Sequence, residues 1–138
     1  MIVVGDIGNS ETKIFLVNHK RKIIKKIILD TKKINLSLLK KSLAISNFDP
    51  KLINKCLFCS VVPKTFNKIK NFFKKEYKKK CFELKKLDLK KLIKIKVNYK
   101  QVGSDRLANA IGVINNKTNF IILDFGTATT FDVLIKDT

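Results

Sequence analysis

The sequence contains two related segments, and this internal repeat constrains the fold more than any other feature. Residues 3–17 read VVGDIGNSETKIFLV, and residues 121–135 read IILDFGTATTFDVLI. Identical residues occupy equivalent positions of the two copies, among them Asp6 and Asp124, Gly8 and Gly126, and Thr12 and Thr130. Each copy reads as an apolar strand, an acidic residue, a polar turn that contains glycine, and a second strand. The chain is therefore expected to contain two similar β-hairpins.

The turn of each hairpin is suited to contact phosphate groups. Glycine removes the Cβ that would otherwise keep phosphate oxygens away from backbone N–H groups. An aspartate at the end of a strand can hold a cation such as Mg²⁺, directly or through water. A single Asp-x-Gly turn would be explained by hairpin geometry alone, but two copies with matching flanks favour turns that clamp one nucleotide. Small polar side chains add hydrogen-bond donors to both turns: Asn9 and Ser10 in the first, and Thr127, Thr129 and Thr130 in the second.

The remaining hydrophobic pattern predicts alternating strands and helices. The first hairpin and a third apolar run at residues 23–29 predict a three-stranded antiparallel meander. Residues 56–62 form a continuous apolar run typical of a buried parallel strand, and residues 120–123 form another. This order predicts an α/β fold with a mixed sheet that begins with the meander. Apolar spacing predicts helices at residues 36–46, 64–77 and 107–115, and a short strand with an exposed connector at residues 82–98.

The strongly basic composition admits two explanations. The chain carries 30 Lys and Arg residues against 11 Asp and Glu residues, a net charge of +19, which is a common signature of nucleic-acid binding. However, only Arg21 and Arg106 are arginine, the residue that reads bases and binds phosphate in a bidentate manner. The codons of Lys, Ile, Asn and Phe are rich in A and T, so genome composition can produce the same bias. We therefore expect attraction to anions such as nucleotides, and no specific nucleic-acid partner.

Several features predict a cytoplasmic protein without a membrane partner. No apolar run approaches the roughly 18 residues of a membrane span, and the N-terminus lacks the basic region of a secretory signal. Three cysteines do not form a disulfide framework. Cys56 and Cys59 have the spacing of a zinc or redox pair, but they lack a second pair and the only histidine is His19, so core thiols are expected. The lysines at residues 78–80 and 85–86 are expected on a solvated surface.

The two hairpins, each at the start of a lobe, resemble those of the actin, hexokinase and Hsp70 ATPase superfamily. Four ordered motifs within residues 6–132 resemble the type III pantothenate kinases: Asp6-Ile7-Gly8-Asn9-Ser10 followed by Lys13, Ser60-Val61-Val62-Pro63, Gly103-Ser104-Asp105-Arg106 with Ala108-Asn109-Ala110, and Asp124-Phe125-Gly126-Thr127-Ala128-Thr129-Thr130. Ser10 stands where the family usually has threonine, a change that keeps the hydroxyl. The resemblance implies a ribonuclease H-like lobe at residues 1–117 and the first hairpin of an incomplete second lobe at residues 118–138.

The resemblance also implies an activity, the ATP-dependent phosphorylation of pantothenate to 4'-phosphopantothenate, the first step of coenzyme A biosynthesis. Asp6 would help to hold Mg²⁺, and Asp124 matches a ligand for a monovalent cation, K⁺ or NH₄⁺. Lys13 is one of many lysines, so a surface position unrelated to ATP stays open for it. The residues that would bind ATP lie in the first hairpin and at one position of the second: Asp6, Ile7, Gly8, Asn9, Ser10, Glu11, Thr12, Lys13 and Thr127.

The third motif would form the pantothenate site. Asp105 matches the proton acceptor of the family, and a carboxylate within hydrogen-bond reach of a hydroxyl can act as its general base. The planar guanidinium of Arg106 is suited to a carboxylate or a phosphate. An alternative is that Asp105 caps the helix that follows and Arg106 forms an exposed salt bridge, and both roles can hold at once. The expected substrate-binding residues are Tyr99, Gly103, Ser104, Asp105 and Arg106.

Length is the main departure from the family. The duplicated fold needs two lobes of comparable size, whereas the sequence stops soon after the second hairpin begins. We therefore expect an N-terminal part of a kinase that is a homodimer when full length, with apolar strands at residues 120–135 left uncovered. A catalytically inactive nucleotide-binding remnant and a basic nucleic-acid-binding or regulatory module are the alternatives.

Overall fold

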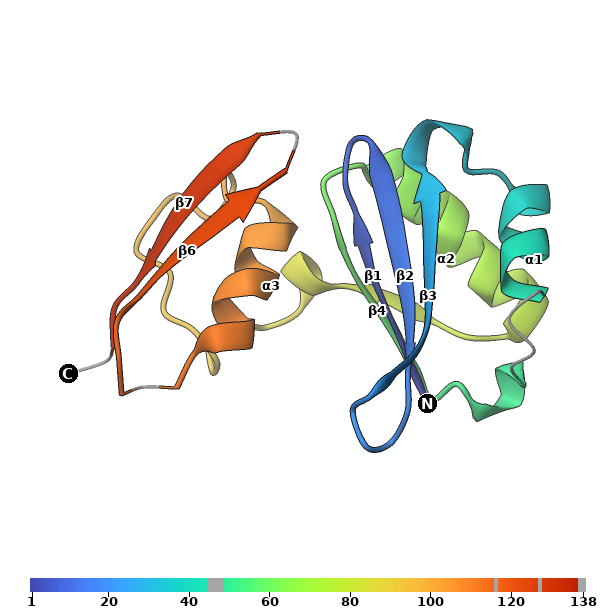
Figure 1. Ribbon diagram of the computed structural model, residues 1–138, viewed down its shortest axis with the longest axis horizontal. Coiled ribbons are helices and arrows are strands. Elements are labelled where there is room, and N and C mark those ends of the chain that lie inside the picture. The colour runs from blue at the N-terminus through green and yellow to red at the C-terminus, as the bar shows by residue number, and fades with distance from the viewer. Residues whose placement is uncertain (45–48, 116, 127, 137–138) are drawn as a thin grey trace.

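The structure is a computed structural model that describes residues 1–44, 49–115, 117–126 and 128–136. Its largest element is a five-stranded mixed sheet with the strand order β3-β2-β1-β4-β5. Helices α1 (Leu36–Ala44) and α2 (Pro63–Tyr77) lie together against one face of this sheet (Figure 1). The sheet consists of β1 (Ile2–Ile7), β2 (Glu11–Val17), β3 (Ile23–Asp30), β4 (Lys55–Ser60) and β5 (Cys81–Glu83).

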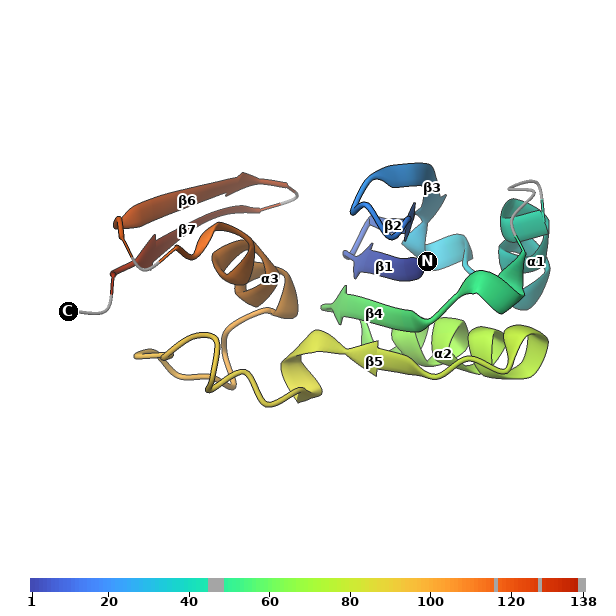
Figure 2. The same cartoon turned by 90° about the horizontal axis from the view of Figure 1, so that it is seen from below.

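The rest of the chain forms a second group of elements. Helix α3 (Ser104–Val113) packs against a separate two-stranded sheet made of β6 (Phe120–Phe125) and β7 (Thr129–Leu134). This group lies beyond the end of the large sheet where β1 and β4 finish (Figure 2). Because ligands of α/β proteins bind outside the carboxyl ends of parallel strands, this end of the sheet is the place to look for a site.

The pairing of the strands confirms the meander and the parallel strand expected from the sequence. Strands β1, β2 and β3 pair antiparallel, whereas β4 runs parallel to β1 and β5 runs parallel to β4. The parallel register sets Asp6 beside Cys59. The N-terminal amine of Met1 donates to the carbonyl of Leu52 at 2.8 Å, which fixes the start of β1 next to the segment that leads into β4.

The main core lies between the sheet and helices α1 and α2. Gly5 is required within it, because a Cβ there would lie 2.2 Å from two ring carbons of the buried Phe58. The aromatic ring of Phe58 packs edge-on against that of Phe73, with their centroids 6.1 Å apart. Alternating strand residues supply the sheet side of this core and helical faces supply the other: Val3, Ile7, Ile14, Leu16, Ile27 and Leu29, with Leu39, Leu43, Phe66, Ile69, Phe72 and Phe73.

A second, smaller core joins the large sheet to α3. Its buried members come from the connector that follows β5 and from α3 itself: Leu84, Leu89, Val102 and Leu107. Leu57 and Cys59 of β4 pack against it from the face of the sheet that α1 and α2 leave uncovered. The two thiols of the Cys-x-x-Cys segment therefore point to opposite faces, and no cluster of three metal-ligating side chains occurs within the described ranges.

The second hairpin repeats the first with a tighter turn. The last pair of the first hairpin is Ile7 with Thr12, whereas Phe125 pairs with Thr129 and not with Thr130, the equivalent of Thr12. A shift of one residue turns the side chains of a strand to the opposite face. Thr130 and Asp132 of β7 therefore share a face with Asp124, and this face is turned towards α3.

The other face of the second hairpin is apolar and uncovered, as expected from the sequence. Phe125 is 76% exposed and Ile121 is 72% exposed. In the first hairpin the positions equivalent to these two are Ile7 and Val3, and both are fully buried beneath α1 and α2. The exposed members of this face are Ile121, Leu123, Phe125, Phe131, Val133 and Ile135.

The helix boundaries differ slightly from those expected. Helix α3 begins at Ser104, three residues before the expected start, because Gly103 already has the extended backbone of an N-cap residue. Helix α1 ends at Ala44 within the described residues, and the expected end at residue 46 lies outside them. Short 3₁₀ turns flank β3, β4 and β5. None of the helices in the described part of the chain is long and apolar enough to cross a membrane.

Candidate functional site

The turn between β1 and β2 is braced from below by Thr31, which follows β3. The hydroxyl of Thr31 donates to the carbonyl of Gly8 at 2.8 Å and lies 2.9 Å from the hydroxyl of Thr12, which is therefore the donor of that second bond. The backbone N–H of Thr31 also donates to the carbonyl of Ser10. This support holds the turn in one conformation with Asn9 and Ser10 exposed at its tip.

The expected ATP-binding residues of this hairpin divide into two groups. The side chains of Ile7 and Thr12 are fully buried, so only their backbone could reach a phosphate. Asn9, Ser10 and Glu11 are exposed, and the ammonium group of Lys13 lies 3.9 Å from the carboxylate of Glu11. The turn thus offers backbone N–H groups, an amide and a hydroxyl to a ligand, which is the donor set that phosphate oxygens require.

Asp6 lies half-buried at the end of β1, on the face turned away from α1 and α2. The thiol of Cys59 donates to its Oδ1 at 3.4 Å and to the carbonyl of Gly5 at 3.5 Å. Burial raises the pKa of the Asp6 carboxyl above its ordinary value; the Cys59 hydrogen bond and the charge of Lys13 lower it, whereas the negative charges of Asp105 and Asp124 raise it. Burial and the same acidic surroundings raise the pKa of Cys59, so its thiol remains a donor.

Asp105 lies in the first turn of α3, near enough to Asp6 for its negative charge to raise the pKa of that carboxyl. The Oδ1 atom of Asp105 accepts from the backbone N–H of Arg106 at 2.9 Å. A Cβ at Gly103 would lie 2.2 Å from that same oxygen, so glycine leaves the space in which the Asp105 carboxylate rests. The buried Ser104 donates from its hydroxyl to Glu83 at 2.6 Å and ties the start of α3 to the end of β5. Ser104 is therefore a structural anchor in this arrangement.

Asp124 approaches the same region from the second hairpin. Asn109, one turn beyond Asp105 on α3, donates from its side-chain amide to Oδ2 of Asp124 at 2.9 Å. Asp6, Asp105 and Asp124 therefore reach the same region from two hairpins and a helix, and the negative charges of Asp105 and Asp124 both raise the pKa of Asp6. Within the described residues the three carboxylates do not form a cluster that could hold one metal ion, so each could contribute to a cation site only together with oxygens of a ligand or of water. Thr127 lies outside the described residues.

Arg106 forms a partly exposed salt bridge with Asp132, and this contact joins α3 to β7. Its Nε–H donates to Oδ1 of Asp132 at 2.8 Å, and its Nη2 donates to the same oxygen and to the carbonyl of Phe131. The hydrogen bond with Asp132 raises the pKa of Arg106, so the guanidinium stays charged. No signal in the sequence indicated this contact, because the pairing of β6 with β7 decides which face of β7 meets α3.

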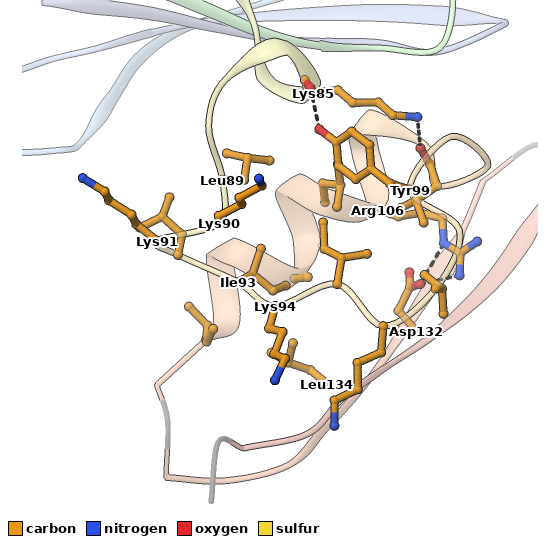
Figure 3. A pocket seen from close by; sticks show the side chains of 18 of the residues that line it. Lys85, Leu89, Lys90, Lys91, Ile93, Lys94, Tyr99, Arg106, Asp132 and Leu134 are labelled. Atoms are coloured by element: carbon orange, nitrogen blue, oxygen red, sulfur yellow. Dashed lines mark hydrogen bonds and ion pairs between the residues drawn. The ribbon is translucent and has the colours of Figure 1, made fainter.

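A cavity of about 1200 Å³ lies beside this contact, between the connector, α3 and the second hairpin (Figure 3). Tyr99 and Arg106 line it, whereas Gly103, Ser104 and Asp105 do not. The hydroxyl of Tyr99 donates to the carbonyl of Lys85, whose ammonium group lies 5.2 Å from the centre of the tyrosine ring. Lys85 also donates to the carbonyl of Val102 at 2.6 Å, so the expectation of a solvated lysine is wrong at this position.

Sequence reasoning singled out three of the converging groups but missed their partners. Cys59 was assigned to the core, and only the parallel register with β1 reveals its contact with Asp6. Asn109 is part of the third motif, but the sequence indicated no role for its side chain. Its position four residues after Asp105 does place both residues on one face of a helix. The contact of Lys85 with Tyr99 had no signal in the sequence, because the two residues meet only through the path of an irregular connector.

Comparison with known proteins identifies the family. A profile of the type III pantothenate kinases matches residues 2–138. The chain is 76% identical over 138 residues to a type III pantothenate kinase of Pelagibacter ubique (strain HTCC1062). The aligned region covers all of this chain and 56% of that relative. Type III pantothenate kinases of Desulfotalea psychrophila and Persephonella marina are 33% and 37% identical, over 99% and 97% of this chain and 55% and 54% of their own lengths.

The chain therefore spans about half the length of the curated relatives that it matches. The match nevertheless covers nearly every residue of the chain and includes all four motifs that carry the resemblance. The chain belongs to the type III pantothenate kinase family, whose fold is that of the actin, hexokinase and Hsp70 ATPases.

Proposed function

We propose that this chain supplies the phosphate-transfer site of a pantothenate kinase, which moves the γ-phosphoryl group of ATP to the primary hydroxyl of pantothenate. The observation that carries the proposal is the position of Asp6 at the end of β1 beside a braced hairpin turn, near enough to Asp105 and Asp124 for their charges to raise its pKa. Phosphoryl transfer needs positioning of the phosphates, neutralisation of their charge and an acceptor for the proton of the attacking hydroxyl. The three carboxylates and the turn can supply each of these requirements.

In this proposal the first hairpin binds the phosphates of ATP. The exposed tip of the turn at Asn9 and Ser10 would contact the phosphates, while the hydrogen bond from the backbone N–H of Gly8 to the carbonyl of Glu11 and the contacts of Thr31 keep the turn from rearranging. Asp6 would hold Mg²⁺, because a carboxylate oxygen completed by water and phosphate oxygens is a common donor set for this ion. When bound, the metal would neutralise part of the charge of the phosphates, and Asp6 would fix its position.

Asp105 acts as the general base in the same scheme. The pantothenate hydroxyl gives its proton to the Asp105 carboxylate as its oxygen bonds to the γ-phosphorus, and the bond from that phosphorus to the bridging oxygen of ADP breaks. The products are ADP and 4'-phosphopantothenate, with the proton on Asp105. Asp124, held by Asn109, would contribute to a site for K⁺ or NH₄⁺ near the transferring group.

The cavity beside α3 suits the acceptor substrate. It combines apolar side chains such as Leu89 and Ile93 with a lysine-rich connector and Arg106, so it offers contacts for an apolar body and for a carboxylate. Pantothenate has both parts. The full-length kinase would be a homodimer by family resemblance, and the residues beyond those of this chain would complete the ATP and pantothenate sites.

The test is a kinase assay on a chimera that joins this chain to the part of the Pelagibacter ubique relative that it does not span. We expect phosphorylation of pantothenate that depends on ATP, Mg²⁺ and K⁺, and a loss of more than about a hundredfold in kcat for Asp105→Asn. Asp49→Asn serves as the matched control, because Asp49 is an exposed carboxylate that does not line the cavity. Unchanged turnover of Asp105→Asn would refute the base, and an inactive chimera that folds would favour the remnant hypothesis.

A further inference from the structure

The contact between Arg106 and Asp132 occupies only one edge of the guanidinium. Nε and Nη2 bind Oδ1 of Asp132 and the carbonyl of Phe131, whereas Nη1 has no hydrogen bond to any residue that the structure describes. The Arg106 side chain is 34% exposed and that of Asp132 is 18% exposed. Both residues line the cavity beside α3 (Figure 3). The remaining edge of Arg106 is therefore available to a ligand there.

We propose that Asp132 is a positioning residue that orients Arg106, so that the free edge of its guanidinium binds the carboxylate of the acceptor substrate. This inference rests on the proposed function, because it names the group that the cavity recognises. It predicts that Asp132 governs affinity for the acceptor and leaves the binding of ATP unchanged. Asp132 itself touches neither the substrate nor the transferring phosphoryl group in this arrangement.

The physical reason is that an unrestrained arginine loses much rotamer freedom when it binds an anion. Two hydrogen bonds to Asp132 and one to Phe131 fix the plane of the guanidinium before the ligand arrives, which lowers the cost of binding. Asp132 also cancels part of the positive charge of Arg106. Asp132 therefore sets the orientation of Arg106, and the lysines around the cavity attract the anion. These lysines are Lys85, Lys86, Lys90, Lys91, Lys94, Lys96 and Lys136.

The second oxygen of Asp132 supports a role beyond a simple tie between elements. Oδ2 is closed to solvent and has no hydrogen-bond partner within the described residues. A buried carboxylate with one unsatisfied oxygen is costly, so a neutral apolar side chain would join α3 to β7 at lower cost. The charge at this position is better explained by the guanidinium that it holds.

The experiment uses the fact that the chain has two arginines, Arg21 and Arg106. In ¹⁵N spectra of the intact chain, only two arginine Nε–H signals are expected, and Arg106→Lys assigns them. We expect a through-hydrogen-bond correlation between Nε–H of Arg106 and the carboxyl carbon of Asp132. Addition of pantothenate should shift the Nε–H signal of Arg106. The signal of Arg21, which lies in the turn before β3, should not shift and serves as an internal reference. Panthenol, which has a hydroxymethyl group in place of the carboxylate, should not shift it.

The variants Asp132→Asn and Asp49→Asn each remove one negative charge, but only the first removes the partner of Arg106, because Asp49 is exposed and lies outside the cavity. Pantothenate should bind Asp132→Asn roughly tenfold more weakly than the unaltered chain, whereas its affinity for Asp49→Asn should equal that for the unaltered chain. Equal affinity of Asp132→Asn and the unaltered chain would overturn the proposal. If Asp132→Asn does not fold, the correlation in the unaltered chain decides, and its absence overturns the proposal as well.

The outcomes also separate this inference from the proposed function. Pantothenate that binds by calorimetry without moving the Arg106 signal would overturn the role of the Arg106–Asp132 pair and leave the kinase proposal intact. Failure of pantothenate to bind either the chain or the chimera would overturn both. A shift of the Arg106 signal by pantothenate and by propionate, but not by panthenol, would support carboxylate recognition directly.

Discussion

Several acidic residues are concentrated in one part of this basic chain. Asp6, Asp105, Asp124 and Asp132 all lie around α3 and the two hairpins, although the chain has only 11 acidic residues and a net charge of +19. The local field near these residues is therefore opposite in sign to that of the whole molecule. The overall charge favours the approach of anions to the surface, whereas the carboxylates favour cations close to α3.

Asp6 is expected to cost stability at neutral pH. The pKa of Asp6 is raised in the folded state. The stability that the protonated form of Asp6 contributes is therefore complete below the ordinary pKa near 4. This contribution is lost as the pH rises through the raised pKa. Asp6→Asn should therefore raise the melting temperature by about 2 °C at pH 7 and by nothing measurable at pH 4. Thermal unfolding at the two pH values checks this, and a lower melting temperature at pH 7 would contradict it.

Two glycines should respond in opposite directions to the same substitution. Gly5→Ala forces a Cβ against the ring of Phe58 and should destabilise the fold by roughly 1–3 kcal/mol. Gly112→Ala is the matched control, because a Cβ there meets no atom within 4 Å and the residue lies in α3. It should stabilise the chain by about 0.5 kcal/mol. Urea unfolding curves of both variants measure the two changes in the free energy of unfolding. An unchanged free energy of unfolding for Gly5→Ala would contradict the prediction.

At the scale of elements, the sequence was most informative where hydrophobic period and turn chemistry agree. The meander and α2 follow from local patterns, and the parallel strand β4 follows from its continuous apolar run. The tighter pairing at Thr129 could not be predicted, because one residue of turn length leaves the apolar pattern unchanged but reverses which face of β7 meets α3. The positions of Asp132 and Cys59 in the site depend on such registers.

The connector after β5 should lose its fixed path when Lys85 is replaced. Lys85→Met removes hydrogen bonds to the carbonyls of Lys100 and Val102 and the contact of its ammonium group with the ring of Tyr99. Hydrogen–deuterium exchange should become about tenfold faster across the connector and remain unchanged in β1. Lys86→Met, at an exposed neighbouring position, is the control. Equal protection in the two variants would show that Lys85 does not restrain the connector.

At the scale of the whole molecule, the two groups of elements differ in how completely they bury their apolar surface. The large sheet has α1 and α2 on one face, with Val3 and Ile7 fully buried, whereas the equivalent residues of the second hairpin are exposed. The repeat therefore produces two hairpins of similar sequence in different surroundings. Relatives about twice as long as this chain contain additional residues that could cover the second one.

The uncovered face of the second hairpin should make the chain self-associate. Ile121 and Val133 face each other across β6 and β7, so Ile121→Lys with Val133→Glu places opposite charges side by side without a large loss of pairing. Sedimentation velocity should show less association, and binding of the dye ANS should fall about twofold or more. Ile24→Lys, on the exposed surface of β3, is the control. Equal association of the unaltered chain, the double variant and Ile24→Lys would show that a different surface causes the self-association.

The parallel pairing of β1 with β4 has a mechanical consequence. The N-terminus lies at the end of β1 far from α3, and β7 ends at Leu134 on the opposite side of α3 (Figure 2). Tension between the two ends pulls β1 along its own axis, so its backbone hydrogen bonds to β2 and β4 are loaded together in shear. In the second hairpin the same tension separates Phe120 from Leu134 first and opens the remaining pairs one after another. Under load the second hairpin yields early, and the strand that carries Asp6 holds to the last.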